Sequence, residues 1–367
     1  MKTPVWLVLP FESEVLREAL WSGYVEHDGK VCRATPRELI VEGSQRKVLL
    51  LLDEFLDQRQ NALSRWWTAL RVEKSFFVAA TAVWVLLLGL GQHWELKVGE
   101  GILACVGSLS LYLAVSAFAE IYDTLRLLDL RRWYGPDQEQ SAILRGWVSP
   151  QKLWFAAWVL MSVALACGIP LIWWNSQALL PMAAMAAVAA WGYAQPPLAL
   201  KYRGWGEVVL FLASGPALAL GFSWCLFSQW NGVMISLGAC VGFWNLTLHH
   251  LGNLPDFDQD REHGVSTWVT QLGFRRARNL VPVLYFMSWA SFFPAVFFVG
   301  MNPILVFALA LLLIPQLRLA FRVLRASGGA SVWMAGVRGR SQRVHAISYV
   351  VAVILTSLCI QLFGGVT

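Results

Sequence analysis

Charge is scarce in this 367-residue chain: charged residues make up 14% of it, while 57% is hydrophobic. A soluble domain carries roughly 25% charged residues, so the composition excludes an ordinary soluble domain and indicates a membrane protein. The net charge of +6 does not call for nucleic acid. Lys and Arg gather in the cytoplasmic loops of membrane proteins, and we expect no nucleic-acid partner.

Paired cysteines are also missing. The six cysteines show no Cys-x-x-Cys spacing, and five of them lie in apolar stretches. This pattern favours their interpretation as small buried hydrophobic residues. The first 70 residues hold scattered charge and no long apolar core, so we expect no cleavable signal peptide.

Long apolar runs dominate the rest of the chain. A membrane-crossing helix needs about 20 mostly apolar residues. Nine segments qualify: 75–92, 101–120, 153–173, 178–194, 207–226, 232–250, 280–299, 303–317 and 347–364. The sequence therefore predicts an all-α, multi-pass membrane protein with nine transmembrane helices in a bilayer.

Residues 71–367 form this transmembrane domain, and residues 1–70 precede it as a cytoplasmic extension. Within the extension, residues 24–34 are typical of a small hairpin turning at Asp28-Gly29. Residues 47–67 are typical of an amphipathic helix lying on the membrane face.

Basic residues alternate between loops. The loops after the second, fourth, sixth and eighth segments are rich in Lys and Arg, whereas the opposite loops hold only Lys97. By the positive-inside rule, the N-terminus is cytoplasmic and the C-terminus outside. We expect the protein in the cell (inner) membrane.

Acidic residues gather at two helix ends. The first group, "AEIYDTLRLLD" (residues 119–129), ends the second segment, and the second, "NLPDFDQDREHG" (253–264), follows the sixth. Both groups are therefore predicted on the cytoplasmic side. Glu120 and Asp123 are three residues apart and share a helix face, whereas Asp129 lies six further on.

The second group continues a polar stripe along one side of the sixth segment. Asp256 and Asp260 share a helix face, and Asp258 points roughly the other way. The stripe follows helical spacing through these residues: Asn245, His249, Asn253, Asp256 and Asp260. Polar groups at membrane depth usually face a bundle interior. Adjacent histidines point in different directions, so we expect His249 to line a pocket rather than bind metal with His250.

Paired carboxylate groups suit Mg²⁺, which often bridges carboxylates to substrate phosphates. A substrate with a phosphate head and an apolar tail fits this setting. Basic residues on the same side are candidates for phosphate contacts: Arg145, Lys201, Arg203 and Arg261. The alternatives are solvated loop acids and ordinary positive-inside loop charges.

These motifs resemble the UbiA superfamily of intramembrane prenyltransferases, most closely the branch that includes the menaquinone-pathway prenyltransferase. The stretch "NLPDFDQDREHGVST" (253–267) matches the second acidic motif of that family, and "AEIYDTLRLLD" the first. Two further stretches are similar: "LRGWVSPQKL" (144–153) and "YAQPPLALKYRGWGE" (193–207). The similarity covers roughly residues 70–364.

The resemblance implies a nine-helix bundle in which an isoprenyl diphosphate binds at a cytoplasmic mouth. Mg²⁺ would join its diphosphate to Glu120, Asp123, Asp129, Asp256 and Asp260, with Asn253 among the diphosphate contacts. The allylic carbocation would then be attacked by an aromatic or quinone-precursor acceptor. Aromatic faces stabilise such a cation; the candidate pocket residues are Tyr122, Tyr193, Trp244, Asn245 and His249.

Three positions depart from the family pattern. Ala119 replaces an Asn, Glu120 an Asp, and Val265 a basic residue. These departures keep two alternatives open. One is a terpene cyclase of the same fold, which needs no acceptor, and the other is a transporter or lipid-binding protein.

Overall fold

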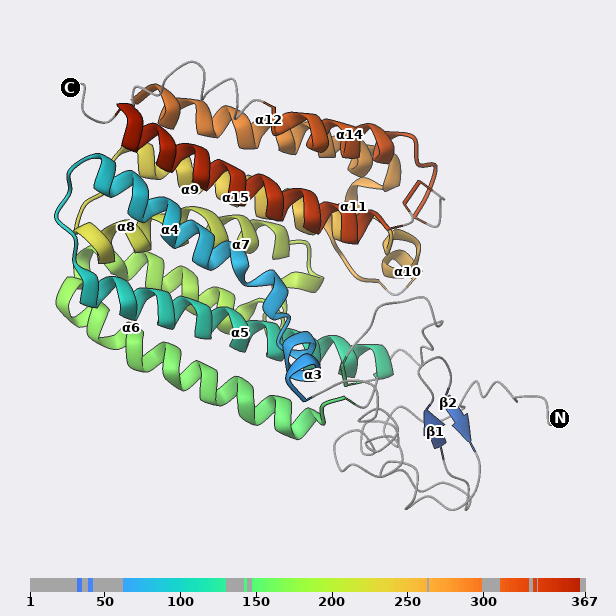
Figure 1. The fold of residues 1–367 in the computed structure, drawn as a ribbon. Helices are drawn as coiled ribbons and strands as arrows, with labels where there is room; N and C mark the ends of the chain where they lie inside the picture. Colours follow the sequence, from blue (N-terminus) through green and yellow to red (C-terminus); the bar gives the residue numbers. More distant parts are fainter. Residues whose placement is uncertain are drawn as a thin grey trace. The chain divides into compact units, whose positions relative to one another are not determined.

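The structure is a computed structural model that describes residues 32–34, 39–41, 62–129, 142–143, 147–262, 264–298, 311–329, 333–334 and 336–363. The chain divides into two compact units, which are described separately. The first comprises Met1–Lys74 and Tyr112–Ser162, and the second Ser75–Leu111 and Val163–Thr367. Apart from one two-stranded ribbon, every regular element in the described part is a helix (Figure 1).

The first unit contains strands β1 (Cys32–Ala34) and β2 (Leu39–Val41), which pair antiparallel, and the short helices α3 (Ala62–Ala69) and η2 (Val72–Lys74). The strand at Cys32 falls within the predicted hairpin, but its partner is Leu39–Val41. Asp28-Gly29 lies outside the described residues, as does the predicted amphipathic helix before Ala62.

The core of the first unit joins the end of α5 (Val98–Asp129) to the start of α6 (Pro150–Ala187). Small residues on α5, such as Ala114 and Ala117, allow close helix packing. Phe118 meets the edges of Trp154 and Trp158, with ring centroids 5.3 and 5.6 Å away. This packing fixes the face of α5 that carries the first acidic motif.

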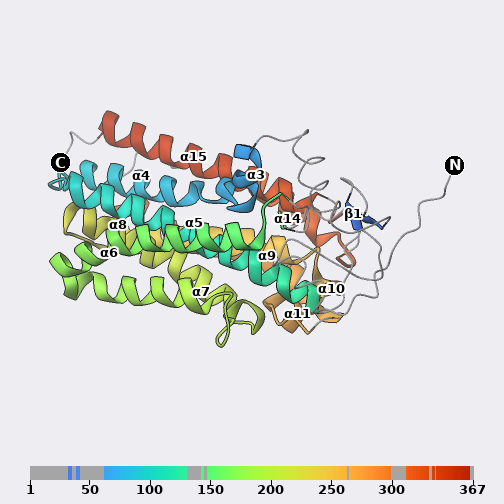
Figure 2. The same cartoon turned by 90° about the horizontal axis from the view of Figure 1, so that it is seen from below.

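The second unit is a bundle of long helices. Its main members, which run side by side in Figures 1 and 2, are α4 (Phe76–Gly91), α8 (Leu218–Phe227), α9 (Gly232–Asn253), α12 (Phe274–Phe298) and α15 (Val337–Phe363). Shorter elements complete it: η3 (Val188–Gly192), η4 (Leu200–Tyr202), α7 (Gly206–Leu212), η5 (Ala213–Ala217), α10 (Phe257–Glu262), α11 (Trp268–Leu272) and α14 (Leu313–Leu324).

An aromatic cluster holds four of these helices together. Trp84 of α4, Trp244 of α9, Phe292 of α12 and Tyr349 of α15 are mutual neighbours, with ring centroids 5.0–6.2 Å apart in the recorded pairs. The Tyr349 hydroxyl also lies 2.9 Å from Oγ1 of Thr81. Aromatic pairs of this kind add about 0.5–1.5 kcal/mol beyond simple burial.

The third and fourth predicted segments are separate helices within the span of α6 and η3, because the backbone leaves helical geometry at Asn175 (φ −133°, ψ 32°). Pro150–Asn175 corresponds to the third segment and Gln177–Gly192 to the fourth. The Asn175 amide donates to Oε2 of Glu100 at 2.9 Å and to the Leu171 carbonyl at 3.3 Å, and its oxygen accepts from Nε1 of Trp224 at 3.2 Å. The contact with the Leu171 carbonyl gives a backbone acceptor near the break a side-chain donor, and the other two contacts tie this point to α5 and α8.

Glycines allow η5 to lie against α9. A Cβ at Gly215 would be 2.4 Å from Cα of Gly242 and 2.5 Å from the Gly238 carbonyl oxygen. Any larger residue at position 215 would force the two backbones apart. The π-helical turn at η5 contains Pro216, which has no N–H to donate to the helix ladder.

Five helices in the described residues are long and apolar enough to cross a membrane: Val72–Gly91, Val98–Asp123, Pro150–Asn175, Gly206–Phe227 and Gly232–Asn253. They correspond to five of the nine predicted segments. α12 covers residues 280–298 of the seventh segment and α15 covers residues 347–363 of the ninth, and the eighth begins outside the described residues. The protein is thus an integral membrane protein by helix composition, and the count of nine and the orientation of the termini stay predictions.

Candidate functional site

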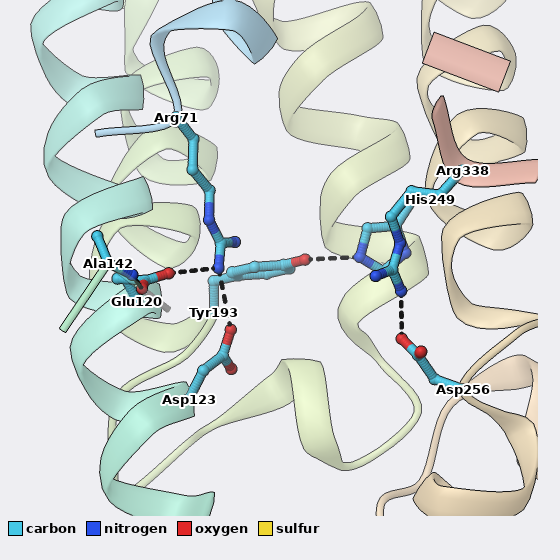
Figure 3. Close-up of polar contacts among 8 residues, drawn as sticks. All are labelled: Arg71, Glu120, Asp123, Ala142, Tyr193, His249, Asp256 and Arg338. Atoms are coloured by element: carbon cyan, nitrogen blue, oxygen red, sulfur yellow. Dashed lines mark hydrogen bonds and ion pairs between the residues drawn. The ribbon is translucent and has the colours of Figure 1, made fainter. Parts of the chain in front are cut away.

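The first acidic motif lies on α5 within the first unit (Figure 3). Nη2 of Arg71 lies 2.8 Å from Oε2 of Glu120 and 3.6 Å from Oδ2 of Asp123. The other oxygen of Glu120 accepts the backbone N–H of Ala142 at 2.7 Å. Glu120 and Asp123 therefore share one face, and a single guanidinium from the α3–η2 turn contacts both.

Arg71 occupies the turn between α3 and η2 with a left-handed backbone (φ 52°), a conformation that few non-glycine residues adopt. Burial acts to lower the pKa of its guanidinium. The neighbouring Glu120 and Asp123 outweigh burial and raise that pKa above its ordinary value. The arginine is thus a permanent positive charge at the first motif.

Three other residues predicted for this region are not seen in contact with Arg71 in the described part of the chain. Tyr122 is half-buried, and its ring meets the edge of Trp154, with centroids 6.3 Å apart. Asp129 ends α5, but its side chain is not among the described ones, and Arg145 lies outside the described residues. Their roles stay predictions.

The second acidic motif spans the end of α9 and the short helix α10 in the second unit. The Asp260 N–H donates to the Asp256 carbonyl at 2.8 Å, so the two side chains lie one helical turn apart. Both are partly buried, whereas Asp258 is exposed. This agrees with the spacing argument that separated Asp258 from its neighbours.

A second arginine contacts this motif. Nη2 of Arg338, from the first turn of α15, donates to Oδ2 of Asp256 and, at 2.8 Å, to the Gly252 carbonyl (Figure 3). This contact joins residues 82 positions apart in the chain. Arg338 therefore fixes the start of the acidic segment against the C-terminal helix.

His249 lies between Asn253 and Tyr193. Nδ2 of Asn253 is 3.3 Å from Nδ1 of His249, and the Tyr193 hydroxyl is 3.1 Å from Nε2 (Figure 3). The amide N–H₂ is a donor, so Nδ1 accepts and Nε2 carries the proton of the neutral ring. Nε2–H then donates to the tyrosine oxygen. His250 instead meets the Ala277 carbonyl at 2.8 Å, so the two histidines do point to different partners.

Deeper along α9, two other predicted pocket residues are packed. Asn245 donates to Oγ of Ser214 at 3.1 Å and is buried. Trp244 is buried in the aromatic cluster. These positions connect α9 to η5, α4 and α15, and their proposed contact with a carbocation stays a prediction.

The basic segment around η4 is bound to the residues that follow the second motif. Arg203 and Ser266 form a parallel β-bridge, in which the Ser266 N–H donates to the Tyr202 carbonyl at 3.2 Å. The buried Glu207 accepts the N–H of Trp268 at 2.9 Å. Lys201 and Arg203 thus belong to a backbone that is hydrogen-bonded to the acidic segment, whereas Arg261 is exposed on α10.

The donor set suits a hard cation held mainly through a substrate. No group of three or more His, Cys, Asp or Glu residues in the described part is arranged to hold a metal directly. Mg²⁺ commonly uses one or two carboxylates plus substrate phosphates rather than an all-protein cage. Asp123 in the first unit, and Asp256 and Asp260 in the second, are the candidate carboxylates for such a role.

Sequence reasoning missed three residues of the site: Arg71, Arg338 and Glu207. Arg338 counted only as one of several basic loop residues, and Arg71 precedes the first apolar segment. Glu207 is the first residue of the fifth predicted segment, and that position was a signal, since acids at membrane helices are costly and are usually paired or functional.

Curated relatives point to a prenyl-transferring family. The chain is 25% identical over 187 residues to a Mycobacterium leprae protein named 1,4-dihydroxy-2-naphthoate octaprenyltransferase, covering 50% of this chain and 62% of that one. A Mycobacterium tuberculosis protein of the same name is 23% identical over 49% of this chain and 61% of its own length. The chain therefore spans about three fifths of these relatives.

Solved structures share the fold. A UbiA homologue from Archaeoglobus fulgidus, described as bound to DMAPP and Mg²⁺, matches with a TM-score of 0.53 at 13% identity, covering 82% of this chain and 100% of that one. A UbiA homologue from Aeropyrum pernix K1 matches with a TM-score of 0.51 at 18% identity, covering 79% and 97%. At these identities the likeness concerns the fold.

The family match covers most of the chain. Residues 78–341 match the family described as the UbiA prenyltransferase family, and this range includes both acidic motifs and the basic segment around η4. The resemblance seen in the motifs is therefore confirmed, and this protein belongs to the UbiA prenyltransferase family.

Proposed function

We propose that this protein transfers an isoprenyl group from an isoprenyl diphosphate to an aromatic, quinone-precursor acceptor within the membrane. The observation that carries the proposal is the second acidic motif: Asp256 and Asp260 lie one turn apart, beside Asn253. A basic segment is hydrogen-bonded to the residues that follow. Carboxylates next to a basic segment in an otherwise apolar chain suit a metal-bound diphosphate.

Charge is the main requirement at the diphosphate. Bound Mg²⁺ would neutralise the departing diphosphate as its charge develops. We propose Asp256 and Asp260 as the metal-binding carboxylates of the second motif, and Asp123 as a metal-binding carboxylate of the first. Lys201, Arg203, Arg261 and Arg145 are the proposed diphosphate contacts, with Asn253 as a neutral partner.

We propose that Tyr193 and His249 bind and orient the prenyl acceptor. The Tyr193 hydroxyl and the His249 ring are in hydrogen-bonding contact. We propose that this pair orients a polar oxygen of an acceptor beside the reacting carbon. Aromatic rings in the apolar interior also stabilise a passing carbocation.

Relatives named as octaprenyltransferases of 1,4-dihydroxy-2-naphthoate favour a transferase with an aromatic acceptor over an acceptor-free cyclase. We propose that this chain takes an acceptor of the same chemical type. We also propose that the diphosphate enters from the cytoplasmic side, where the positive-inside rule places both motifs.

The test uses the full chain purified in detergent. It is incubated with Mg²⁺ and all-trans prenyl diphosphates of increasing length, with and without 1,4-dihydroxy-2-naphthoate or a simple phenolic acid. Diphosphate release and product mass are measured. Turnover that requires an acceptor supports the proposal. A cyclic hydrocarbon or alcohol formed without an acceptor overturns it in favour of a cyclase, and no release with any diphosphate refutes the enzymatic reading.

A further inference from the structure

Glu120 and Asp123 share a helix face, but their surroundings differ. The Glu120 side chain is 6% exposed, and both of its oxygens are engaged, one by Arg71 and one by the Ala142 N–H. The Asp123 side chain is 23% exposed and lies at the longer distance of 3.6 Å from the same arginine nitrogen. The two carboxylates are therefore not equivalent as metal ligands.

A metal ion on Glu120 would compete with both of its contacts. The buried Ala142 N–H depends on this carboxylate as its acceptor, and an unsatisfied buried donor is costly. Glu120 is also the nearest counter-charge of the partly buried Arg71. Asp123 is neither the acceptor for Ala142 nor the nearest counter-charge of Arg71.

The glutamate at position 120 fits a structural role for this residue and a ligand role for Asp123. A glutamate is one methylene longer than the aspartate expected from the family pattern. Its reach allows one carboxylate to contact both the Arg71 guanidinium and the backbone of the segment that leads toward α6. The departure from the motif is thus matched by a contact that a shorter side chain would not make.

The arginine at the second motif provides a contrast. The side chains of Arg338 and Asp256 are 39% and 36% exposed. Exposed ion pairs contribute little and exchange readily with other partners. The side chains of Arg71 and Glu120 are 30% and 6% exposed, so this ion pair is less screened by solvent than the pair of Arg338 and Asp256.

We propose that Arg71 is a built-in cation of the first acidic motif, that Glu120 is a positioning residue which holds it, and that Asp123 is the carboxylate of this pair which serves the metal-bound diphosphate. This inference rests on the proposed function, because it assigns roles at the same site. Arg71 precedes the family match at 78–341, so the N-terminal segment supplies a part of the site.

A first experiment reads metal response without catalysis. The unfolding temperature of the purified full chain is followed as Mg²⁺ is added with inorganic diphosphate, for the wild type, Glu120→Gln and Asp123→Asn. Glu73→Gln, an exposed carboxylate on η2, is the control. We expect Glu120→Gln and the control to keep the wild-type Mg²⁺ midpoint, and Asp123→Asn to raise it by about 10-fold or more.

A second experiment separates charge from packing at Arg71. Arg71→Ala should raise the Mg²⁺ concentration for half-maximal diphosphate release by about 10-fold, whereas Arg71→Lys, which keeps the charge, should recover most of the loss. The same two variants are compared by Mg²⁺ midpoint in the unfolding assay. A purely structural arginine would lower the unfolding temperature and leave both Mg²⁺ midpoints unchanged.

The outcomes decide between the assignments. A midpoint in Glu120→Gln shifted as far as in Asp123→Asn would make Glu120 a metal ligand and overturn the inference, as would unchanged midpoints in Arg71→Ala. If the wild type releases no diphosphate from any prenyl diphosphate, the proposed function fails. The unfolding assay with inorganic diphosphate still tests Arg71 in that case.

Discussion

The hydroxyl of Tyr193 lies 3.1 Å from Nε2 of His249, and the other ring nitrogen of that histidine faces the amide of Asn253 at 3.3 Å. The tautomer of the ring follows from this arrangement, because only the amide N–H₂ can donate to Nδ1. A histidine fixed in this way acts as a hydrogen-bond donor to the tyrosine rather than as a metal ligand.

Tyr193→Phe should therefore impair the reaction with the acceptor more than the binding of the prenyl diphosphate. We expect kcat to fall by about 10- to 100-fold, typical for loss of one well-placed hydrogen-bonding group, with KM for the diphosphate little changed. Tyr285→Phe is the matched control, since the buried Tyr285 hydroxyl has no hydrogen-bond partner among the described residues. Equal losses in both variants would contradict the role of Tyr193.

The acidic residues of the second motif should separate by helix face. Asp256→Ala and Asp260→Ala are each expected to lower diphosphate release by about 100-fold or more, since each removes a proposed metal-binding carboxylate. Asp258→Ala should stay within about twofold of the wild type, because an exposed side chain on the other face contributes little. Release rates at saturating Mg²⁺ provide the measurement. A loss at Asp258 equal to that at Asp256 would show that the two faces are not functionally distinct.

Asn175 should matter for stability rather than chemistry. Asn175→Ala removes an acceptor from Nε1 of Trp224 and a donor to Glu100, two partly buried contacts. We expect a loss of about 1–3 kcal/mol in the free energy of unfolding. Trp224→Phe, which removes only Nε1–H, should cost less. Denaturant unfolding in detergent measures both, and a cost at Trp224 that exceeds the cost at Asn175 would contradict the hydrogen-bond account.

Close packing of η5 on α9 gives a second stability prediction. Gly215→Ala places a methyl group 2.4 Å from Cα of Gly242, so we expect a loss of at least about 1–3 kcal/mol from overpacking. Gly168→Ala on α6 is the control, since a Cβ there meets nothing within 4 Å. That variant should be neutral or slightly stabilising, because alanine favours a helix over glycine. Two equal unfolding midpoints would argue against tight contact at Gly215.

Local spacing was enough to predict the second acidic motif. Three- and four-residue steps place side chains on one helix face. The sequence alone therefore distinguished Asp258 from the pair Asp256 and Asp260. The family followed from the same stretch, because the acids, the arginine and the glycine occur at characteristic distances. The all-helical fold followed from the length of the apolar runs.

Long-range partners were not predictable in this way. Arg71 and Arg338 meet acids 49 and 82 positions away, and periodicity within a segment carries no information about such pairs. Arg338 was interpreted only as a loop charge. The break between the third and fourth segments was predicted, and helical geometry does end at Asn175. The partners of Asn175, Glu100 and Trp224, come from other helices and were not predicted.

The bridge between Arg203 and Ser266 uses main-chain atoms, and the Ser266 N–H donates to the Tyr202 carbonyl. Main-chain hydrogen bonds do not depend on which side chains the paired residues carry. Positions 201 and 203, the proposed diphosphate contacts, can therefore exchange one side chain for another while the path of the loop is preserved. Under the proposed function, preference among anionic head groups is adjustable separately from the backbone.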